Sequence, residues 1–315
     1  MRQMFFFFVC FSALFGSCFA IPVIVDTDIG SAMDDTWALG YLLTSPEVDI
    51  KLIVTATQNT TQRAQIVAKF LDTVGRSDIP IGIGYTNGEY IGPQYNYASD
   101  YDLDKYPGVI YQDGIKAMIE VIQAHPRVTM LELAPATNFA EVISRERSLV
   151  QARVRVVTMG GSIYKGYNDS NTPTAEYNVA TNVSAAQTMF SATYNRMRIY
   201  AAPLDTAGLI FIGGENYQQL VAARYTNNLV RVILENYYYS RNGSDVHTST
   251  VLCDVEAAHM SFSKKYLVNE LLPIRVNETG FTVIDYEYGM PTILAMSWAG
   301  LQDFADEVTK RLLSW

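Results

Sequence analysis

The chain has 315 residues, of which 49% are hydrophobic, and its 23 basic and 32 acidic side chains give a formal net charge of −9. This negative charge argues against a nucleic-acid polymer or an anionic membrane as the partner. The length and the hydrophobic content are sufficient for one large domain with its own core.

Residues 1–20 predict a secretory signal peptide. Arg2 gives a basic start, residues 5–15 are apolar, and Cys18 to Ala20 form a small-x-small cleavage site. The apolar run is shorter than the roughly 20 residues that a membrane span needs, so we expect no membrane association of the mature chain. We therefore expect a secreted, extracellular protein in which residues 21–315 form a single α/β domain.

Two further features bear on this expectation of secretion. Removal of residues 1–20 leaves Cys253 as the one cysteine, so the mature chain can form no internal disulfide bond, which is unusual outside the cell. Five Asn-x-Ser/Thr sequons suit an extracellular glycoprotein. They begin at Asn59, Asn168, Asn182, Asn242 and Asn277.

Short β-branched segments alternate with amphipathic helical patterns, which predicts an open, mainly parallel sheet flanked by helices. The predicted strands are 23–25, 52–54, 81–83, 130–133, 154–157 and 198–200. The predicted helices between them are 35–43, 61–74, 114–124 and 139–149. Beyond Leu204 the pattern changes, and we expect a long helix over 217–239, antiparallel strands around 274–284, which make the sheet mixed, and a last helix over 301–313.

Four aspartates follow the first predicted strand within ten residues: Asp26, Asp28, Asp34 and Asp35. Functional groups of open parallel sheets gather at the carboxyl ends of strands. Helix capping can explain Asp34 or Asp35. It cannot explain Asp26 and Asp28 as well, because crowded carboxylates repel one another unless a cation or shared protons compensate. Oxygen ligands in this number favour Ca²⁺ or Mg²⁺. Zinc is disfavoured, because the histidines and Cys253 show no pair at ligand spacing.

The segment from Asp26 to Gly30, followed by Asp34 and Asp35, resembles the amino-terminal signature of the inosine-uridine-preferring nucleoside hydrolases, which are calcium-dependent N-ribohydrolases. The resemblance continues, in the right order, along most of the chain. The later segments that match are 52–59 with the helix and strand after it, 134–138 (APATN), 159–161 (MGG), 173–178 (PTAEYN) and the pair Cys253-Asp254. The resemblance implies a nucleoside-hydrolase-like α/β fold.

The resemblance also implies a metal site. Asp28, Asp35, Asp254 and the main-chain carbonyl group of Thr137 would hold Ca²⁺, and Asp28 would be the general base for a water molecule. Asp26 would support these ligands from behind. Ca²⁺ lowers the pKa of a bound water less than Zn²⁺ does, so a nearby carboxylate is needed as the base.

A ribonucleoside is the substrate that the resemblance implies, with hydrolysis of its N-glycosidic bond to ribose and a free purine or pyrimidine base. Asp34, Asn178 and Asp254 would bind the 2′- and 3′-hydroxyls, Glu176 the 5′ side, and Asn59 would lie beside the sugar. The chemistry agrees, because the transition state is positively charged and carboxylates stabilise it. Homo-oligomers are usual in the family, so a homo-oligomer is a further expectation.

Two departures from the family pattern motivate an alternative function. Ala32 stands where the family usually has an aspartate, and Cys253 stands where a histidine usually precedes Asp254. In relatives that histidine has been proposed to protonate the departing base, and a thiol with a pKa of ~8.5 is a different acid. The alternative is a secreted protein that binds a ribosyl ligand in the same pocket with weak or no catalysis. His247 and His259 are candidate substitutes, although a lone histidine more often packs or lies on the surface.

Overall fold

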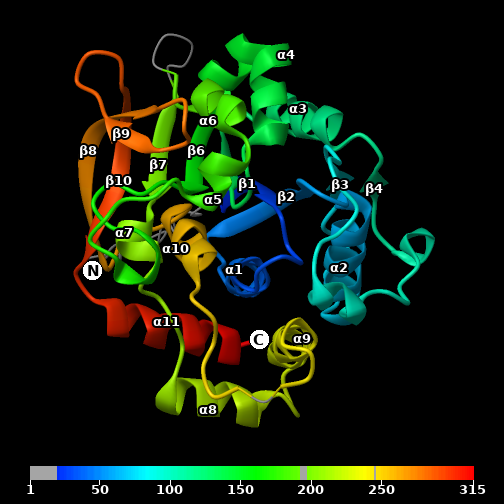
Figure 1. Cartoon of the computed structure of the whole chain (residues 1–315). Helices are drawn as coiled ribbons and strands as arrows, with labels where there is room; N and C mark the ends of the chain where they lie inside the picture. Colours follow the sequence, from blue (N-terminus) through cyan, green and yellow to red (C-terminus); the bar gives the residue numbers. More distant parts are fainter. Residues whose placement is uncertain (1–19, 192–196, 245) are drawn as a thin grey trace, which may run out of the picture.

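The computed structural model describes residues 20–191, 197–244 and 246–315 (Figure 1). The predicted signal peptide therefore falls, apart from Ala20, outside the described residues. The described strands form one ten-stranded sheet in the order β4-β3-β2-β1-β5-β6-β7-β10-β8-β9. Their bounds are β1 Ile21–Thr27, β2 Val48–Thr55, β3 Ile81–Ile83, β4 Ile110–Tyr111, β5 Val128–Glu132, β6 Val154–Met159, β7 Arg198–Ala202, β8 Leu267–Val276, β9 Thr282–Ile284 and β10 Met290–Trp298.

The sheet is mixed, as predicted. All neighbouring strands from β4 at one edge, through β3, β2, β1, β5, β6 and β7, to β10 pair in parallel. Strand β8 pairs antiparallel with both β10 and β9. The six strands predicted for the parallel part are all present. The antiparallel strands expected around 274–284 are present as β8 and β9, although β8 begins earlier, at Leu267, and β10 was not predicted.

Helices cover both faces of the sheet (Figure 1). Successive strand residues point to opposite faces, so Ile24 joins the core beneath one helical layer, and Val23 and Val25 join the other. The first layer contains α3 (Gly114–Ala124), α4 (Thr137–Arg153), α5 (Tyr177–Thr181) and α6 (Val183–Met189). The second contains α1 (Asp34–Leu43), α2 (Thr60–Thr73), α7 (Leu204–Ala207), α8 (Gly214–Ala223), α9 (Asn228–Ser240), α10 (Cys253–Met260) and α11 (Leu301–Leu313).

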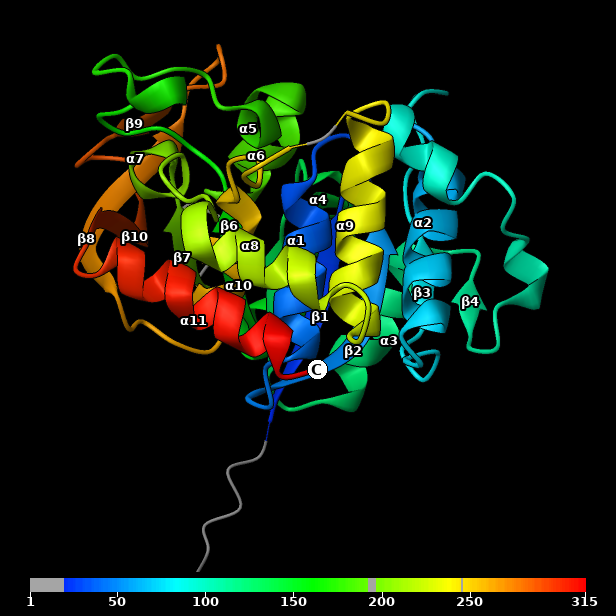
Figure 2. The ribbon, with the colours of Figure 1, turned by 90° about the horizontal axis from the view of Figure 1, so that it is seen from below.

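Figure 2 shows α8, α9 and α11 on the outside of the second layer. Three short 3-10 helices lie in the loops: η1 (Pro93–Tyr97), η2 (Leu103–Lys105) and η3 (Tyr167–Asp169). None of the helices in the described ranges is both long and apolar enough to cross a membrane.

The single long helix predicted over 217–239 is wrong, because the structure has α8 and α9 instead. Asn227 separates them, with an extended backbone (φ −121°, ψ 110°) and a side chain that accepts a hydrogen bond from the main-chain N–H of Val230 at 2.9 Å. Its amide also donates to the carbonyl oxygen of Leu312 at 2.9 Å. The side chain of Asn227 thus ends the helical run by capping α9 and tying it to α11.

The strand order places a topological switch point between β1 and β5. The chain runs outward from β1 through β2 and β3 to β4, and then returns to β5 on the other side of β1. Asp26, near the end of β1, stands opposite Glu132, at the end of β5. Ligands of open α/β sheets bind outside the carboxyl ends of the strands at such a point.

Candidate active site

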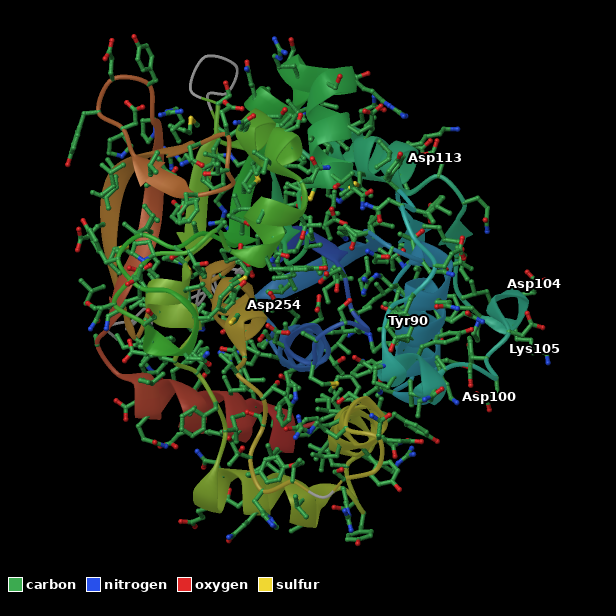
Figure 3. All side chains as sticks on the ribbon, viewed as in Figure 1. Tyr90, Asp100, Asp104, Lys105, Asp113 and Asp254 are labelled. Atoms are coloured by element: carbon green, nitrogen blue, oxygen red, sulfur yellow. The ribbon has the colours of Figure 1, made fainter. Side chains whose placement is uncertain are left out.

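Three carboxylates from two helices converge near the switch point. Asp34 and Asp35 lie in the first turn of α1 and Asp254 in the first turn of α10, and one oxygen atom of each lies within 4.8 Å of the others. Figure 3 labels Asp254 at the start of α10, beside α1. Negative charge is stabilised at the amino-terminal ends of helices, so two helix termini favour this cluster.

Burial makes the cluster costly without a cation. It raises the pKa of Asp34 to about 7 and those of Asp35 and Asp254 well above the ordinary value, and the neighbouring carboxylates raise each pKa further. All three groups offer oxygen, which is the donor that hard divalent cations prefer. These residues therefore fit a divalent metal ion, which would compensate the charge.

Asp28 lies beside this cluster but is not one of the three residues whose oxygen atoms converge within 4.8 Å. Burial raises the pKa of its carboxyl group, while the nearby Arg63 charge and a hydrogen bond with Asp35 lower it. The Thr27 hydroxyl donates a hydrogen bond to Asp35, which fixes the orientation of that carboxylate. The loop after β1 and the start of α1 are thus joined through their side chains.

Arg63 is a component of the site that the sequence did not reveal. Its side chain is 0% exposed, and Nη1 donates to the main-chain carbonyl oxygens of Asp28 and Ile29. Nε donates to the carbonyl oxygen of Thr57 at 2.9 Å, and Nη2 to the hydroxyl of Ser31 at 2.9 Å. The guanidinium group thereby holds the loop between β1 and α1 in shape. The sequence did contain one sign that Arg63 is buried, because the helical spacing places it on the same face of α2 as the apolar residues that pack into the core.

Asp26 lies behind the cluster, as expected from the resemblance. Its Oδ1 accepts a hydrogen bond from Nδ2 of Asn138 at 2.8 Å, and its carboxyl group lies beside that of Glu132. Burial raises the pKa of Asp26 to about 7 and that of Glu132 well above its ordinary value. Both side chains are 0% exposed, so one shared proton would satisfy their facing oxygens.

Glu176 and Asn178 connect the loop after β6 to the site. Glu176 caps α5 by accepting main-chain N–H groups of Asn178 at 2.9 Å and Val179 at 3.3 Å, and it also accepts that of Gly161 at 3.2 Å. Burial raises its pKa to about 7. The amide of Asn178 donates to the carbonyl oxygens of Leu133 and Met159, which follow β5 and end β6. Both residues are therefore held by main-chain contacts at the carboxyl edge of the sheet.

Thr137 follows β5 and Asn59 follows β2, the two strands on either side of β1, and the hydrogen bonds of both side chains go to other groups than the aspartate cluster. The Thr137 hydroxyl accepts a hydrogen bond from Nδ2 of Asn182 at 2.9 Å and lines a cavity of about 820 Å³ between α3, α4 and α6. The aspartate cluster does not line that cavity. Asn59 caps α2 through a 3.0 Å hydrogen bond from the N–H of Gln62. The role of the Thr137 carbonyl group as a metal ligand stays a prediction.

Two half-exposed tyrosines border the acidic groups and were also missed. Tyr167 and Tyr177 are 45% and 47% exposed, and the Tyr167 hydroxyl accepts the N–H of Tyr177 at 2.8 Å. Burial and the charges of Glu176, Cys253 and Asp34 raise the pKa of Tyr167 to about 12. Burial and the Asp28 charge raise the pKa of Tyr177. Their rings offer aromatic surface at the edge of the site.

Cys253 lies among these acidic groups as a neutral thiol. Burial raises its pKa well above the ordinary value, and the charges of Asp34, Asp254 and Glu176 raise it further. His259 does not replace the missing imidazole, because it is buried, bonds to the Tyr41 hydroxyl at 2.9 Å and has its pKa lowered to about 4 by burial.

Known proteins match this chain in sequence and in fold. Residues 23–303 match the family model described as "Inosine-uridine preferring nucleoside hydrolase". The chain belongs to the nucleoside hydrolase family. The expectation of an enzyme, an N-glycosyl hydrolase, is thereby confirmed at the level of the family.

Similar sequences include two bacterial ribonucleoside hydrolases. A pyrimidine-specific enzyme of Citrobacter koseri is 28% identical over 226 residues, which cover 68% of this chain and 69% of that protein. A non-specific enzyme of Klebsiella pneumoniae is 26% identical over 239 residues, which cover 71% and 73%.

Solved structures of nucleoside hydrolases share the fold. A plant enzyme has a TM-score of 0.76 at 20% identity and covers 94% of this chain and 99% of its own. An inosine-uridine preferring nucleoside hydrolase from Bacillus anthracis has a TM-score of 0.76 at 16% identity and covers 94% and 100%. The predicted nucleoside-hydrolase-like fold is confirmed.

Proposed function

We propose that the protein is a calcium-dependent hydrolase that splits ribonucleosides into ribose and a free base. The observation that carries the proposal is the carboxylate cluster of the half-buried Asp34 and the buried Asp35 and Asp254 beside Asp28, in a member of this family. Desolvation and mutual repulsion disfavour four ionised carboxylates at one place unless a divalent cation compensates their charge. Donors that are all oxygen atoms favour Ca²⁺.

The proposal assigns Asp28, Asp35, Asp254 and the Thr137 carbonyl group to Ca²⁺. Bound there, the ion would hold the ribose hydroxyls and lower the pKa of a water molecule. Asp28 would serve as the general base toward that water, and Arg63 holds the main chain of Asp28 in place.

The sugar is bound by groups that the fold holds in place. Asp34, Asn178 and Asp254 accept or donate hydrogen bonds at the 2′- and 3′-hydroxyls, Glu176 contacts the 5′ side, and Asn59 lies beside the sugar. The surrounding carboxylates stabilise the positive charge that develops on C1′ and O4′ when the bond to the base breaks. The base then faces the aromatic edge formed by Tyr167 and Tyr177.

The proposal includes secretion. The basic, apolar and small-residue pattern of residues 1–20 supports it, and so do the five sequons. The test is to express the full chain in a eukaryotic secretory host, sequence the amino terminus of the product and treat it with a glycosidase. A product in the medium that starts at Ile21 supports secretion, and a retained product that starts at Met1 contradicts it.

The neutral Cys253 favours one competing function, a ribosyl-binding protein with weak or no catalysis. The discriminating experiment measures release of reducing sugar from purine and pyrimidine ribonucleosides, with Ca²⁺ and with a chelator. Asp28→Ala is the control. Chelator-sensitive release that Asp28→Ala abolishes supports the hydrolase. Binding of Ca²⁺ and ribose without release from any nucleoside supports the binding protein.

A further inference from the structure

A second cavity lies at the opposite edge of the sheet, at the amino ends of β1, β5, β6 and β7. Its volume is about 620 Å³, and Arg127, Arg153, Arg155 and Arg198 line it together with Tyr200. Figure 2 shows the start of β1 toward its lower edge, on the side of the sheet away from the loops that carry the aspartates. This cavity is therefore separate from the candidate active site.

The lining of this arginine cavity contains no aspartate or glutamate among the described residues. This concentration of positive charge is unusual in a chain with a net charge of −9. Within the described ranges, none of the four arginines forms an ion pair with a carboxylate. Like charges in one cavity repel, so the arrangement favours an anion.

The strand register brings two of these charges side by side. Arg155 of β6 stands opposite Arg198 of β7, on neighbouring strands whose backbones lie about 4.8 Å apart. Residues paired in this way point to the same face of the sheet, and like charges at such positions are destabilising. Lys264 adds a third positive charge, with Nζ 4.7 Å from the ring centroid of Tyr200. An oxyanion between these groups would remove the repulsion.

Two of the arginines are held rigidly by neutral acceptors. Arg155 donates to the Thr129 hydroxyl at 2.8 Å and to the carbonyl oxygen of Ser261, just after α10. Arg153 donates to three carbonyl oxygens between Ile122 and His125, the shortest bond being 2.7 Å to Gln123. Carbonyl groups satisfy N–H donors but carry only partial charge, about half a charge at a helix end. Most of the positive charge therefore stays uncompensated.

Desolvation increases the need for a counter-ion. Burial lowers the pKa of Arg155, because desolvation disfavours its charged form. Arg127 and Arg198 are exposed and can approach a ligand from the rim. Two arginines held by hydrogen bonds and two exposed arginines at the rim suit a ligand with several oxygen atoms, because guanidinium groups bind phosphate oxygens in a bidentate manner.

We propose that the arginine cavity binds a small ligand through a phosphate or pyrophosphate group. Its volume is within the range of about 300 to 1,000 Å³ that is typical of small-molecule sites. The ligand is either an inorganic oxyanion or a phosphorylated nucleoside, and both share the same phosphate chemistry.

The test is calorimetric titration of the purified protein, in a chelator and without Ca²⁺, with inorganic pyrophosphate, adenosine diphosphate and adenosine. The chelator makes the result independent of the proposed hydrolase. We expect saturable binding of pyrophosphate that Arg127→Ala/Arg198→Ala weakens at least tenfold. The matched control, Arg224→Ala/Arg241→Ala, removes two exposed arginines elsewhere and should change the affinity less than twofold.

Three comparisons decide the outcome. Tighter binding of adenosine diphosphate than of pyrophosphate, with no binding of adenosine in the chelator, identifies a nucleotide as the ligand class. Equal binding of the two identifies the inorganic oxyanion. The proposal is overturned if pyrophosphate shows no saturable binding, or if both double variants weaken it equally, because attraction would then be non-specific. Thermal unfolding of each variant checks that the fold is retained.

Discussion

Arg63 and Asp28 are joined by a hydrogen bond from the guanidinium group to the main-chain carbonyl oxygen of Asp28, and both side chains are buried. The same guanidinium group binds carbonyl groups of Ile29 and Thr57. A single residue of α2 therefore shapes the loop that carries the proposed catalytic base.

Substitution of Arg63 should cost both stability and activity. In Arg63→Met the buried carbonyl groups lose their donors and Asp28 loses its neighbouring cation, so the free energy of unfolding should fall by about 3 kcal/mol or more. Arg63→Lys, which keeps the charge, should lose less. Urea unfolding measures the free energy of unfolding of both variants, with the exposed Arg224→Met as control. Equal stability of Arg63→Met and Arg224→Met would show that the loop does not depend on Arg63.

The buried carboxylates predict an unusual pH dependence in the absence of metal. The pKa values of Asp26 and Asp34 are raised from 3.8 to about 7, so the folded state binds more protons than the unfolded state between these values. Stability in a chelator is therefore fully present below about pH 4 and is lost as the pH rises through about 7, by on the order of a few kcal/mol.

Calcium should cancel this trend, because it binds the ionised carboxylates. The midpoint of urea unfolding should fall from pH 4 to pH 8 in the chelator and stay nearly level with excess Ca²⁺. Asp34→Asn should flatten the chelator curve. A midpoint that rises with pH in the chelator would mean that these carboxylates are ionised at little cost in the folded protein.

Tyr177 should contribute to binding of the base but not of ribose. Stacking of a base on an aromatic ring contributes about 1–3 kcal/mol, so Tyr177→Ala should raise KM for nucleosides about tenfold. Inhibition by free ribose should be unchanged, and Tyr177→Phe should resemble the wild type. A parallel loss of ribose inhibition in Tyr177→Ala would place the ring against the sugar instead.

Cys253 should limit departure of the base. Its raised pKa keeps the thiol protonated and a poor proton donor, whereas an imidazole with a pKa of about 6.5 is a suitable acid. Cys253→His should raise kcat for purine nucleosides at least tenfold and introduce a loss of activity above about pH 6.5. Cys253→Ala should leave kcat unchanged. A decrease in kcat for both variants would show that the thiol itself takes part.

The sequence predicted the parallel half of the fold because its buried strands are short β-branched runs between clear helical patterns. The prediction of one continuous helix over 217–239 was wrong because the capping by Asn227 was not recognised. The aspartates were found because they crowd together directly after a strand. Arg63 was missed because an arginine within a helix usually reaches solvent, and its partners are main-chain carbonyl groups that leave no mark in the sequence. Tyr167 and Tyr177 meet the acidic groups only through tertiary contacts.

The most direct test of the central claim is ribose release from inosine and uridine, measured against the concentration of free Ca²⁺ in one sample series. The proposed function predicts that activity follows the saturation curve for Ca²⁺ and disappears in the chelator. Asp254→Asn should shift both curves together to higher Ca²⁺. Full activity in the chelator, or saturation with Ca²⁺ without any release of ribose, would contradict the claim that this carboxylate cluster serves hydrolysis of nucleosides.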